Sequence, residues 1–398
     1  MGKKQSVLFL LVLFSFTNSS AIAQRLLYPK VPGIVVDHSP ALSGLYIGSP
    51  SICILPNGDY IASHDFFGPK SSEHTLGITW IFCSSDKGIT WKKISEIKGQ
   101  FWSTIFVHNN YLYIIGTSCN YGNLIIRRSL DGGISWTNPD TNQHGLLRIG
   151  NYHTAPTPVI TYKGRIWRAM EHAINLPGAS SKTLSAFMIS ADANADLLKA
   201  SSWSQSNELP FDSTYLNGSF GGWLEGNAVI DSKGNICDIL RVATEITGKE
   251  FASIIHVSKN GRESTFDPKS GFINFPGGSK KFTIRYDPES KLYWTLSNYI
   301  SAGFRNMKNT SAIRNTLALC SSKDLIYWKV NRIVLQNSDY TKHGFQYVDW
   351  QFDDNDLIIL SRTAFDDGSE EAHSFHDANF LTFHRIKKFR KFAKISIK

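Results

Sequence analysis

The chain has 398 residues, of which 42% are hydrophobic, 13% are aromatic and only 19% are charged, and this composition excludes an intrinsically disordered protein. Its formal charge of +9 lies at the two ends of the chain, because Lys3, Lys4 and seven basic residues of the segment 385–398 account for all of it. The body of the chain is therefore close to neutral, which argues against a nucleic-acid-binding protein.

The chain opens with the pattern of a secretory signal peptide. Two lysines precede an apolar run over residues 7–16, and the small-residue site Ala21-Ile22-Ala23 follows. The apolar run is roughly half of the ~20 residues that a membrane-spanning helix needs, and no later stretch approaches that length. We therefore expect residues 1–23 to be removed, and residues 24–398 to form one domain that is secreted or periplasmic, without stable membrane insertion.

Six times along the chain, two β-rich runs flank a short polar turn, a pattern that predicts a β-hairpin. The turns lie about 50 to 70 residues apart with further β-rich runs between them, which is typical of a β-propeller. A sandwich or barrel would not require the same hairpin six times. We therefore predict an all-β fold, a six-bladed β-propeller of four-stranded antiparallel blades. The hairpins are Ser51–Ser63, Ser103–Gly116, Pro158–Met170, Asn227–Val242, Phe282–Leu296 and Tyr347–Arg362.

A second repeat supports the same count. Ser84–Trp91 and Ser129–Trp136 both fit the pattern S-x-D-x-G-x-[ST]-W, and Ser322–Trp328 is a shortened copy. In such a turn Asp accepts hydrogen bonds from amides, Gly permits positive φ and Trp packs against the blade. We therefore interpret Asp86 and Asp131 as structural residues. The motif resembles the Asp-box (BNR) repeat of the sialidase (neuraminidase) superfamily, whose fold is a six-bladed propeller, and the resemblance spans essentially the whole chain after the leader.

The resemblance also implies an active site at the centre of the ring. Carried over onto this sequence, Tyr347 is the nucleophile, Glu225 is the base that activates it, and Asp65 is the acid/base. Arg241 and Arg314 would grip a carboxylate, because two planar guanidinium groups bind it better than lysines can. A neutral phenol avoids the repulsion between an anionic nucleophile and an anionic sugar. The implied activity is that of a sialidase-like, exo-acting, retaining glycoside hydrolase for a terminal anionic sugar.

One position departs from the family pattern. Sialidases open the first blade with an arginine, the first of three, whereas Gly48 stands at the matching place in Tyr46-Ile47-Gly48-Ser49-Pro50. Arg285, in the fifth hairpin, is a possible substitute. The loss of this arginine leaves the sugar open among uronate, sialate and sulfated glycans.

Each of these candidate site residues also has a purely structural interpretation. Glu225 and Arg241 could form a plain ion pair across one hairpin, Tyr347 could be strand surface, and Asp65 could cap a turn. Further polar or aromatic residues fall in loops next to innermost strands, and we expect some of them to bind substrate. They are His64, Trp102, His153 and His343, with Glu171, His172, His376 and Asp377 standing out without an assigned role.

These residues keep two alternatives open, a polysaccharide lyase or other glycosidase that uses His in place of Tyr, and a propeller that binds carbohydrate without catalysis. No His pair has metal-binding spacing and no phosphate loop occurs, so we expect no metal and no cofactor. The expected partner is a glycan, and we expect a monomer.

Two further features of the sequence are its five cysteines and its basic C-terminal segment. The spacing of Cys53, Cys83, Cys119, Cys237 and Cys320 fits neither a disulfide framework nor a zinc site, so we interpret them as small buried residues with at most one or two bridges. The basic tail, residues 385–398, is interpreted as a solvated end, with contact to an acidic surface as the alternative.

Overall fold

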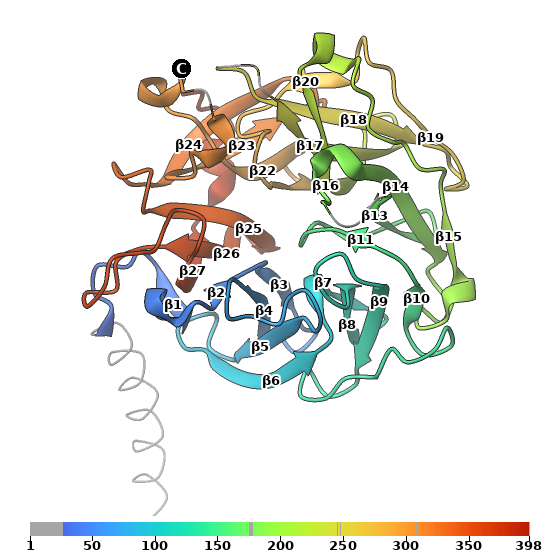
Figure 1. Ribbon diagram of the computed structural model, residues 1–398, viewed down its shortest axis with the longest axis horizontal. Coiled ribbons are helices and arrows are strands. Elements are labelled where there is room, and N and C mark those ends of the chain that lie inside the picture. The colour runs from blue at the N-terminus through green and yellow to red at the C-terminus, as the bar shows by residue number, and fades with distance from the viewer. Residues whose placement is uncertain (1–26, 175–177, 245, 247, 308, 398) are drawn as a thin grey trace, which may run out of the picture.

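The computed structural model describes residues 27–174, 178–244, 246, 248–307 and 309–397, so the expected leader, residues 1–23, lies outside the described residues. The described chain forms six antiparallel sheets that stand around a common centre, each with its innermost strand nearest the axis (Figure 1). The predicted all-β, six-bladed propeller of four-stranded blades is therefore confirmed.

The blades follow one another along the chain. Blade 1 contains β2 (Tyr46–Ile47), β3 (Ser51–Ile54), β4 (Tyr60–Phe67), β5 (Ile78–Ser84) and β6 (Lys92–Lys98). Blade 2 contains β7 (Phe101–His108), β8 (Tyr111–Thr117), β9 (Leu124–Ser129) and β10 (Leu146–Arg148). Blade 3 contains β11 (Tyr152–His153), β12 (Ile160–Tyr162), β13 (Arg165–Ala173), β14 (Leu184–Asp192) and β15 (Trp203–Gln205).

Blade 4 contains β16 (Phe220–Ile230), β17 (Ile236–Thr244), β18 (Phe251–Val257), β19 (Ser264–Thr265) and β20 (Phe272–Asn274). Blade 5 contains β21 (Thr283–Asp287), β22 (Leu292–Asn298), β23 (Thr316–Ser322) and β24 (Trp328–Gln336). Blade 6 contains β25 (Gly344–Asp353), β26 (Asp356–Ala364), β27 (Phe380–Ile386) and β1 (Ile34–His38). Three blades have a fifth strand because one of their four strand positions is split into two short pieces.

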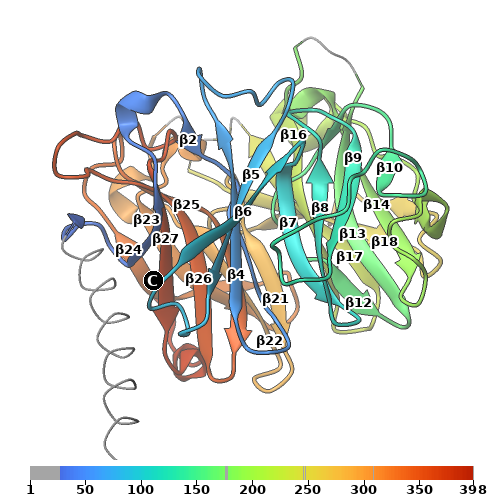
Figure 2. The ribbon, with the colours of Figure 1, turned by 90° about the horizontal axis from the view of Figure 1, so that it is seen from below.

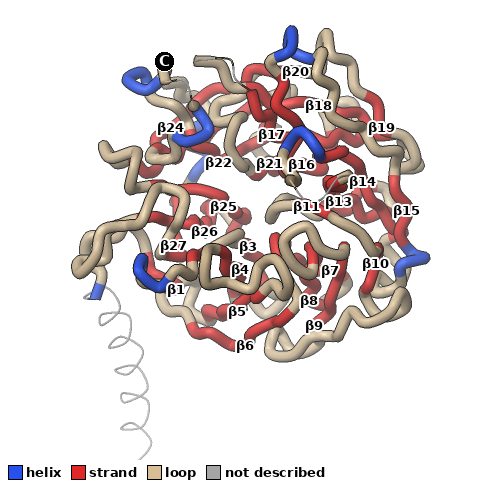
Figure 3. Tube along the Cα trace, in the orientation of Figure 1, coloured by secondary structure: helices blue, strands red, loops and turns tan. Residues whose placement is uncertain are grey.

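The helical segments of the described chain are short 3-10 turns outside the strands, six on loops between strands and one after the last strand (Figure 3). They are η1 (Ala41–Ser43), η2 (Ser181–Thr183), η3 (Ala200–Ser202), η4 (Tyr215–Gly218), η5 (Ala302–Phe304), η6 (Thr310–Ala312) and η7 (Phe389–Phe392).

All six predicted hairpins are present, and each forms the two innermost strands of one blade. In blade 1, for example, Ser51 pairs with Ser63, and in blade 6 Phe345 pairs with Thr363. The tight turns of the β3–β4, β21–β22 and β25–β26 hairpins lie together at one end of the propeller, the lower end in Figure 2. The starts of the innermost strands therefore meet at the other end.

The ring is closed by pairing the two ends of the described chain. β1, near the N-terminus, is the outermost strand of blade 6 and pairs with β27, so that Ile34 lies opposite Phe383. The His64 ring Nε2 lies 2.8 Å from the Asp37 carboxylate and ties this strand to blade 1. The sequence did not predict this closure.

The apolar core is divided among the interfaces between neighbouring blades. On β4, Tyr60 and Ala62 pack toward blade 6, whereas Ile61 between them packs toward blade 2. On β26, Leu360 packs toward blade 1 and Ile359 toward blade 5. Because successive side chains of a strand point to opposite faces, a strand buried on both faces needs an unbroken apolar run, which these hairpins have.

The aspartate-containing turns connect the third and fourth strands of their blades. Asp86 accepts hydrogen bonds from the Thr90 amide at 2.9 Å and from the Thr90 and Ser84 hydroxyls. Asp131 makes the same bonds with Ser135 and Ser129, and the Ser135 hydroxyl bond contributes most to lowering the Asp131 pKa to about 2. These contacts are internal to the turns, as the structural interpretation of both carboxylates requires.

The basic tail is not a solvated end over its whole length. Arg385 lies 2.7 Å from Asp353, and Arg390 donates two hydrogen bonds to Asp287 at 2.8 and 2.9 Å. Phe389 between them is buried against Trp294 of blade 5. The tail therefore packs across blades 5 and 6, because its phenylalanines supply an apolar face that a purely charged tail lacks. All five cysteines are free thiols, so no bridge forms among them.

We predict that Asp86→Ala lowers the free energy of unfolding by about 1–3 kcal/mol, because the turn amide and hydroxyl lose their charged acceptor. Burial raises the Asp86 pKa, but the hydrogen bonds from Thr90, Ser84 and Ile89 together outweigh burial and lower it, so this stabilisation is lost as the pH falls through that pKa. Urea unfolding at pH 7 and at pH 3 measures both effects. Equal stability of the variant and the unchanged protein at pH 7 would contradict the structural interpretation of the turn.

Candidate active site

The innermost strands of blades 2, 4 and 6 share an irregularity in their first half. Each contains a β-bulge, between Phe101 and Thr104, between Leu224 and Asn227, and between Gln346 and Asp349. Inside the three bulges Trp102, Glu225 and Tyr347 have φ angles of 47°, 59° and 53°. Side chains of this size rarely adopt positive φ, and such strain concentrates at functional sites. The bulges therefore mark this end of the channel as the candidate active site.

Tyr347 and Glu225 meet although 122 residues separate them in the sequence. The Tyr347 hydroxyl interacts with the Glu225 carboxylate and the Arg241 guanidinium group, lowering the Glu225 pKa and raising the Arg241 pKa. Arg241 donates to Glu225 at 3.1 Å through Nη1 and to the main-chain oxygen of Ser279 at 2.8 Å through Nε. A phenol, a carboxylate and a guanidinium group therefore form one contact network.

Two further guanidinium groups face the Tyr347 ring. The Cζ atoms of Arg314 and Arg362 lie 5.6 and 4.8 Å from the ring centroid. Arg314 donates to Ser311 at 3.0 Å and to the Gln346 side chain, and Arg362 donates to the main-chain oxygen of His376. Nη2 of Arg314 and Nη1 of Arg362 have no acceptor within the part of the chain that the structure describes. Both groups can therefore donate to a ligand.

The electrostatics set the protonation of the central pair. Burial raises the Glu225 pKa, but Arg241, His153 and Tyr347 outweigh burial, so the net pKa is lowered. Burial and the Glu225 charge raise the Tyr347 pKa more than the three arginines lower it. At neutral pH the site therefore holds an ionised carboxylate beside a neutral phenol, which is the arrangement required for Glu225 to accept the phenolic proton.

A buried lysine supports the bulge that carries Tyr347. Lys281 donates to the main-chain oxygen of Val348 and to the Thr283 hydroxyl, each at 2.7 Å. Burial lowers the pKa of this ammonium group to about 7. Lys281 thus stabilises the strained backbone of the bulge through the main-chain oxygen of Val348.

Arg362 was missed by the sequence reasoning although a signal was present. It pairs with Gln346, the residue before Tyr347, just as Arg241 pairs with Leu224, the residue before Glu225. Both arginines lie on the second strand of a hairpin whose first strand has the bulge. A comparison of the hairpins in register would have found Arg362 as the counterpart of Arg241.

Asp65 is close to this network but is enclosed. Its two carboxylate oxygens accept hydrogen bonds from the amides of Ser49 at 2.5 Å and Trp102 at 2.6 Å, and the residue is 2% exposed. Burial outweighs these bonds and raises the Asp65 pKa. The carboxyl group fixes the strained backbone of Trp102, which gives it a positioning role.

Gly48 lies against the same carboxylate. A Cβ atom at this position would stand 1.8 Å from Asp65 Oδ1. The place that the family pattern gives to an arginine therefore has no room for any side chain while Asp65 keeps its position. Arg362, from another blade, supplies a third guanidinium group near Tyr347.

Glu73, in the loop between β4 and β5, is a second candidate that the sequence reasoning missed. Its side chain is 15% exposed, and it interacts electrostatically with Asp65 and Arg362. Burial raises the Glu73 pKa, and the Asp65 charge adds to the increase. The Glu73 main-chain oxygen accepts a hydrogen bond from Asn120 at 2.7 Å, which connects the loop to the next blade. Glu73 lies in a loop and belongs to no recognised motif, so nothing in the sequence pattern indicated a functional role for it.

Trp102, Tyr121 and His153 form an aromatic wall beside Glu225. The Trp102 ring centroid lies 4.4 Å from that of His153 and 5.3 Å from that of Tyr121, edge to face in both cases. Tyr121 also has positive φ, at 54°. His153 Nδ1 lies 2.8 Å from the buried Glu171 carboxylate, which fixes the orientation of the imidazole. The structure thus brings Trp102 and His153 together beside Glu225, and their binding of substrate stays a prediction.

A further imidazole at this end belongs to His376. Its ring stands edge to face on Phe67 at 5.2 Å, and Nδ1 lies 2.8 Å from Asp377. Burial, followed by the charges of Arg362 and Arg314, lowers the His376 pKa to about 4, so the ring is neutral at pH 7.

Three sequence candidates lie elsewhere. Arg285 donates to the main-chain oxygen of Trp350 at 2.6 Å and to Asp349, and it lines a cavity at the opposite end of the channel. His64 is fully buried, and its two ring nitrogens contact the Asp37 carboxylate and the main-chain oxygen of Asp65. His343 stacks on Phe365 at a centroid distance of 4.5 Å. The structure does not bring these three residues to the network around Tyr347.

Among the described residues, no group of three or more His, Cys, Asp or Glu side chains could hold a metal ion. The described helices are all too short to cross a membrane.

Solved structures of similar fold include glycoside hydrolases. An α-L-arabinanase of Penicillium chrysogenum, complexed with arabinobiose, matches 92% of this chain and 99% of its own, with 12% identity and a TM-score of 0.55. A Hadza microbial sialidase matches 90% of this chain and 69% of its own, at 13% identity and a TM-score of 0.60. The Trypanosoma rangeli sialidase gives 14% identity and a TM-score of 0.56, over 90% of this chain and 56% of its own.

These similarities show the fold, which is the propeller shared by sialidases and arabinanases. No protein-family model and no curated protein matches the chain by sequence.

We predict that Gly48→Ala lowers the free energy of unfolding by about 1–3 kcal/mol, because the new Cβ atom must displace the Asp65 carboxylate and its bond to Trp102. Gly303→Ala is the matched control, since a Cβ atom there meets nothing within 4 Å. Thermal unfolding of both variants measures the effect. A Gly48→Ala protein as stable as the Gly303→Ala protein would show that the packing at Gly48 is looser than described.

Proposed function

We propose that the protein is a retaining glycoside hydrolase of the sialidase type that removes a terminal anionic sugar from a glycan. The observation that carries the proposal is the contact of Tyr347 with Glu225 and Arg241, with Arg314 and Arg362 beside the phenol ring. The expected leader implies action outside the cytoplasm, and we extend the proposal to a secreted or periplasmic monomer.

The central pair can supply the nucleophile. Glu225 takes the phenolic proton while the Tyr347 oxygen bonds to the anomeric carbon, and the bond from that carbon to the leaving oxygen breaks. Hydrolysis of the tyrosyl-sugar bond then returns the proton from Glu225 to the phenol. The lowered Glu225 pKa and the raised Tyr347 pKa keep the carboxylate ionised and the phenol protonated before the reaction, which is the starting state that this transfer requires.

The arginines favour a sugar with a negative charge. Three guanidinium groups around one phenol leave a strong positive field, and Arg314 and Arg362 each retain a terminal nitrogen free for a ligand within the described chain. A carboxylate or sulfate on the sugar would accept from these groups in a planar, charge-assisted geometry. A neutral sugar such as arabinose would offer them only hydroxyl and ring oxygens and no charged acceptor.

Glu73 is the better supported proton donor for the leaving group. Both carboxylate oxygens of Asp65 accept hydrogen bonds from backbone amides, and the residue is only 2% exposed. Asp65 could therefore donate a proton to the leaving group only after these hydrogen bonds break. Glu73 is partly exposed and has a raised pKa, as a general acid requires. After protonating the leaving oxygen, the Glu73 carboxylate can activate the water that hydrolyses the tyrosyl-sugar bond.

The first test is hydrolysis of 4-methylumbelliferyl glycosides of sialic acid, glucuronic acid and arabinofuranose. We expect turnover of an acidic glycoside, and a loss of about 10³-fold or more in kcat for Tyr347→Phe and for Glu225→Gln. Tyr327→Phe, on the outer wall, is the control that should keep full activity. Undiminished kcat in Tyr347→Phe would eliminate the nucleophile assignment, and glycan binding without any turnover would favour the non-catalytic alternative.

The second test is the pH dependence of kcat/KM. Activity should be lost as the pH falls through the lowered Glu225 pKa and as it rises through the raised Glu73 pKa, which gives an acidic optimum. Glu73→Gln should remove the decrease on the alkaline side and slow substrates with poor leaving groups more than 4-methylumbelliferyl substrates. Asp65→Asn should instead lower thermal stability. If kcat/KM of the Glu73→Gln protein still decreases on the alkaline side, another group is the general acid.

His153 supports a second candidate, an elimination reaction. With Nδ1 held by Glu171, its Nε2 could take the proton beside a uronate carboxylate, while the bond to the leaving oxygen breaks and a double bond forms. The product would then show ultraviolet enone absorbance. Hydrolysis yields no such chromophore, so one spectrum separates the two reactions.

A further inference from the structure

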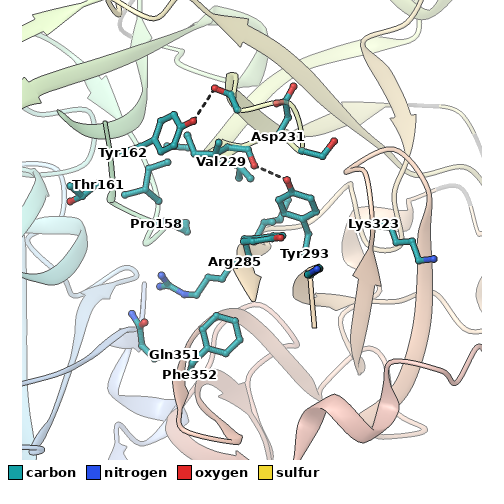
Figure 4. Close-up of a pocket in the computed structure, with 18 residues that line it drawn as sticks. Pro158, Thr161, Tyr162, Val229, Asp231, Arg285, Tyr293, Lys323, Gln351 and Phe352 are labelled. Carbon is teal, nitrogen blue, oxygen red and sulfur yellow. Dashed lines mark hydrogen bonds between the residues drawn. The ribbon is translucent and has the colours of Figure 1, made fainter. Parts of the chain in front are cut away.

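A second cavity lies at the opposite end of the channel, among the turns of the inner hairpins. Its volume is about 750 Å³, within the range of small-molecule sites. The turns of blades 3, 4 and 5 and the end of β25 supply its walls, with Tyr162, Tyr293 and Phe352 among the lining rings (Figure 4). Tyr286 also lines the cavity and is 45% exposed, and its ring centroid lies 4.9 Å from that of Tyr293.

The charged groups of this cavity are mainly basic. Arg285, Lys291 and Lys323 line it, and Asp231 is the acid among the lining residues. The Asp231 carboxylate already accepts bonds from the amides of Lys233 and Asn235, at 2.8 Å each, and from the Asn235 side chain. Three of the lining side chains are therefore basic and one is acidic, and Asp349, outside the lining, lies 3.2 Å from Arg285 Nη2.

Arg285 lies at the base of the cavity and retains a free donor. Its Nε and Nη2 atoms bind the Trp350 oxygen and Asp349, whereas Nη1 has no acceptor in the described ranges. Figure 4 shows the guanidinium group extending toward Gln351. The Gln351 amide nitrogen donates to the main-chain oxygen of Ile52 at 3.0 Å, which leaves its side-chain oxygen as an acceptor in the lining of the cavity. A fixed guanidinium group and an amide oxygen in one cavity suit a sugar that has both a carboxylate and hydroxyl groups.

This cavity is distinct from the candidate active site. The same strands connect the two, since β25 carries Tyr347 near its start and Gln351 and Phe352 near its end. At ~3.3 Å per residue, four residues of strand separate the sites by roughly 13 Å. Lys281, Thr283 and Asp349 are buried between them, so a ligand in one site does not contact the other.

We propose that this cavity is a second, non-catalytic binding site for an acidic oligosaccharide. A uronate carboxylate binds Arg285, the lysines of the rim add long-range attraction, and a sugar ring stacks on Tyr286. Such a site would hold an acidic polysaccharide on the protein while the other end of the channel acts on a chain terminus.

The test is calorimetric titration of trigalacturonate into the Tyr347→Phe protein, which prevents turnover. We expect Tyr286→Ala and Arg285→Lys to weaken binding at least tenfold, while Tyr327→Ala leaves it unchanged. Tyr327 is a matched control because it is 79% exposed on the same blade and outside the cavity. Arg285→Lys keeps a cation beside Asp349, and thermal unfolding checks that the variants fold. Maltotriose, which is neutral, should not bind.

The outcomes separate this proposal from the proposed function. Trigalacturonate binding that is lost in Arg314→Ala but unchanged in Tyr286→Ala would place the ligand at the other end and overturn the second site. Equal binding of maltotriose would overturn the acidic specificity. If Tyr286-dependent binding occurs and no glycoside is cleaved, the cavity proposal stands and the hydrolase proposal fails. Tyr286→Ala should leave hydrolysis of small 4-methylumbelliferyl substrates unchanged.

Discussion

Each blade of this protein has two apolar faces, and neither can be buried without a neighbouring blade. Six separate clusters of buried side chains lie at the six interfaces, so the stability of each blade depends on a closed ring. The pairing of β1 with β27 supplies the closure by joining strands from both ends of the described chain. The contacts between blades at the centre, such as that of Tyr347 on blade 6 with Glu225 on blade 4, depend on that closed geometry.

The ring also supports local strain. Trp102, Glu225 and Tyr347 each have a backbone conformation that costs of order 1–3 kcal/mol and persists only when surrounding contacts fix it. The contacts are visible: Asp65 binds the Trp102 amide, Arg241 binds Glu225, and Lys281 binds the carbonyl next to Tyr347. Without the bulges, these three side chains would follow the regular alternation of their strands. Strain in the inner strands is thus the means by which a stable scaffold presents reactive groups.

The sequence predicted the parts of the fold and site that are local or repeated. All six inner hairpins were found because each has an apolar run and turn residues, and Tyr347, Glu225, Arg241 and Arg314 do lie together. Arg285 does not join them, because a position on an inner strand does not say at which end of the channel the side chain lies. His64 and His343 do not join them either, because His64 is buried against Asp37 and His343 stacks on Phe365. Glu73 was missed because a loop carboxylate has no pattern. The role of Arg362 could not be predicted because it depends on the register between two strands. The need for glycine at position 48 could not be predicted either, because it depends on where the Asp65 carboxylate lies.

The sequence alone determined the class of fold and the number of blades, because hairpins and aspartate turns are encoded by neighbouring residues that recur along the chain. Only the tertiary structure decided which side chains share an end of the channel, how many arginines surround the phenol, and that a second cavity lies at the far end. Those facts depend on closure, strand direction and bulges, which join residues more than a hundred positions apart. Short-range patterns do not contain this information, since burial and approach through space appear only when the ring is complete.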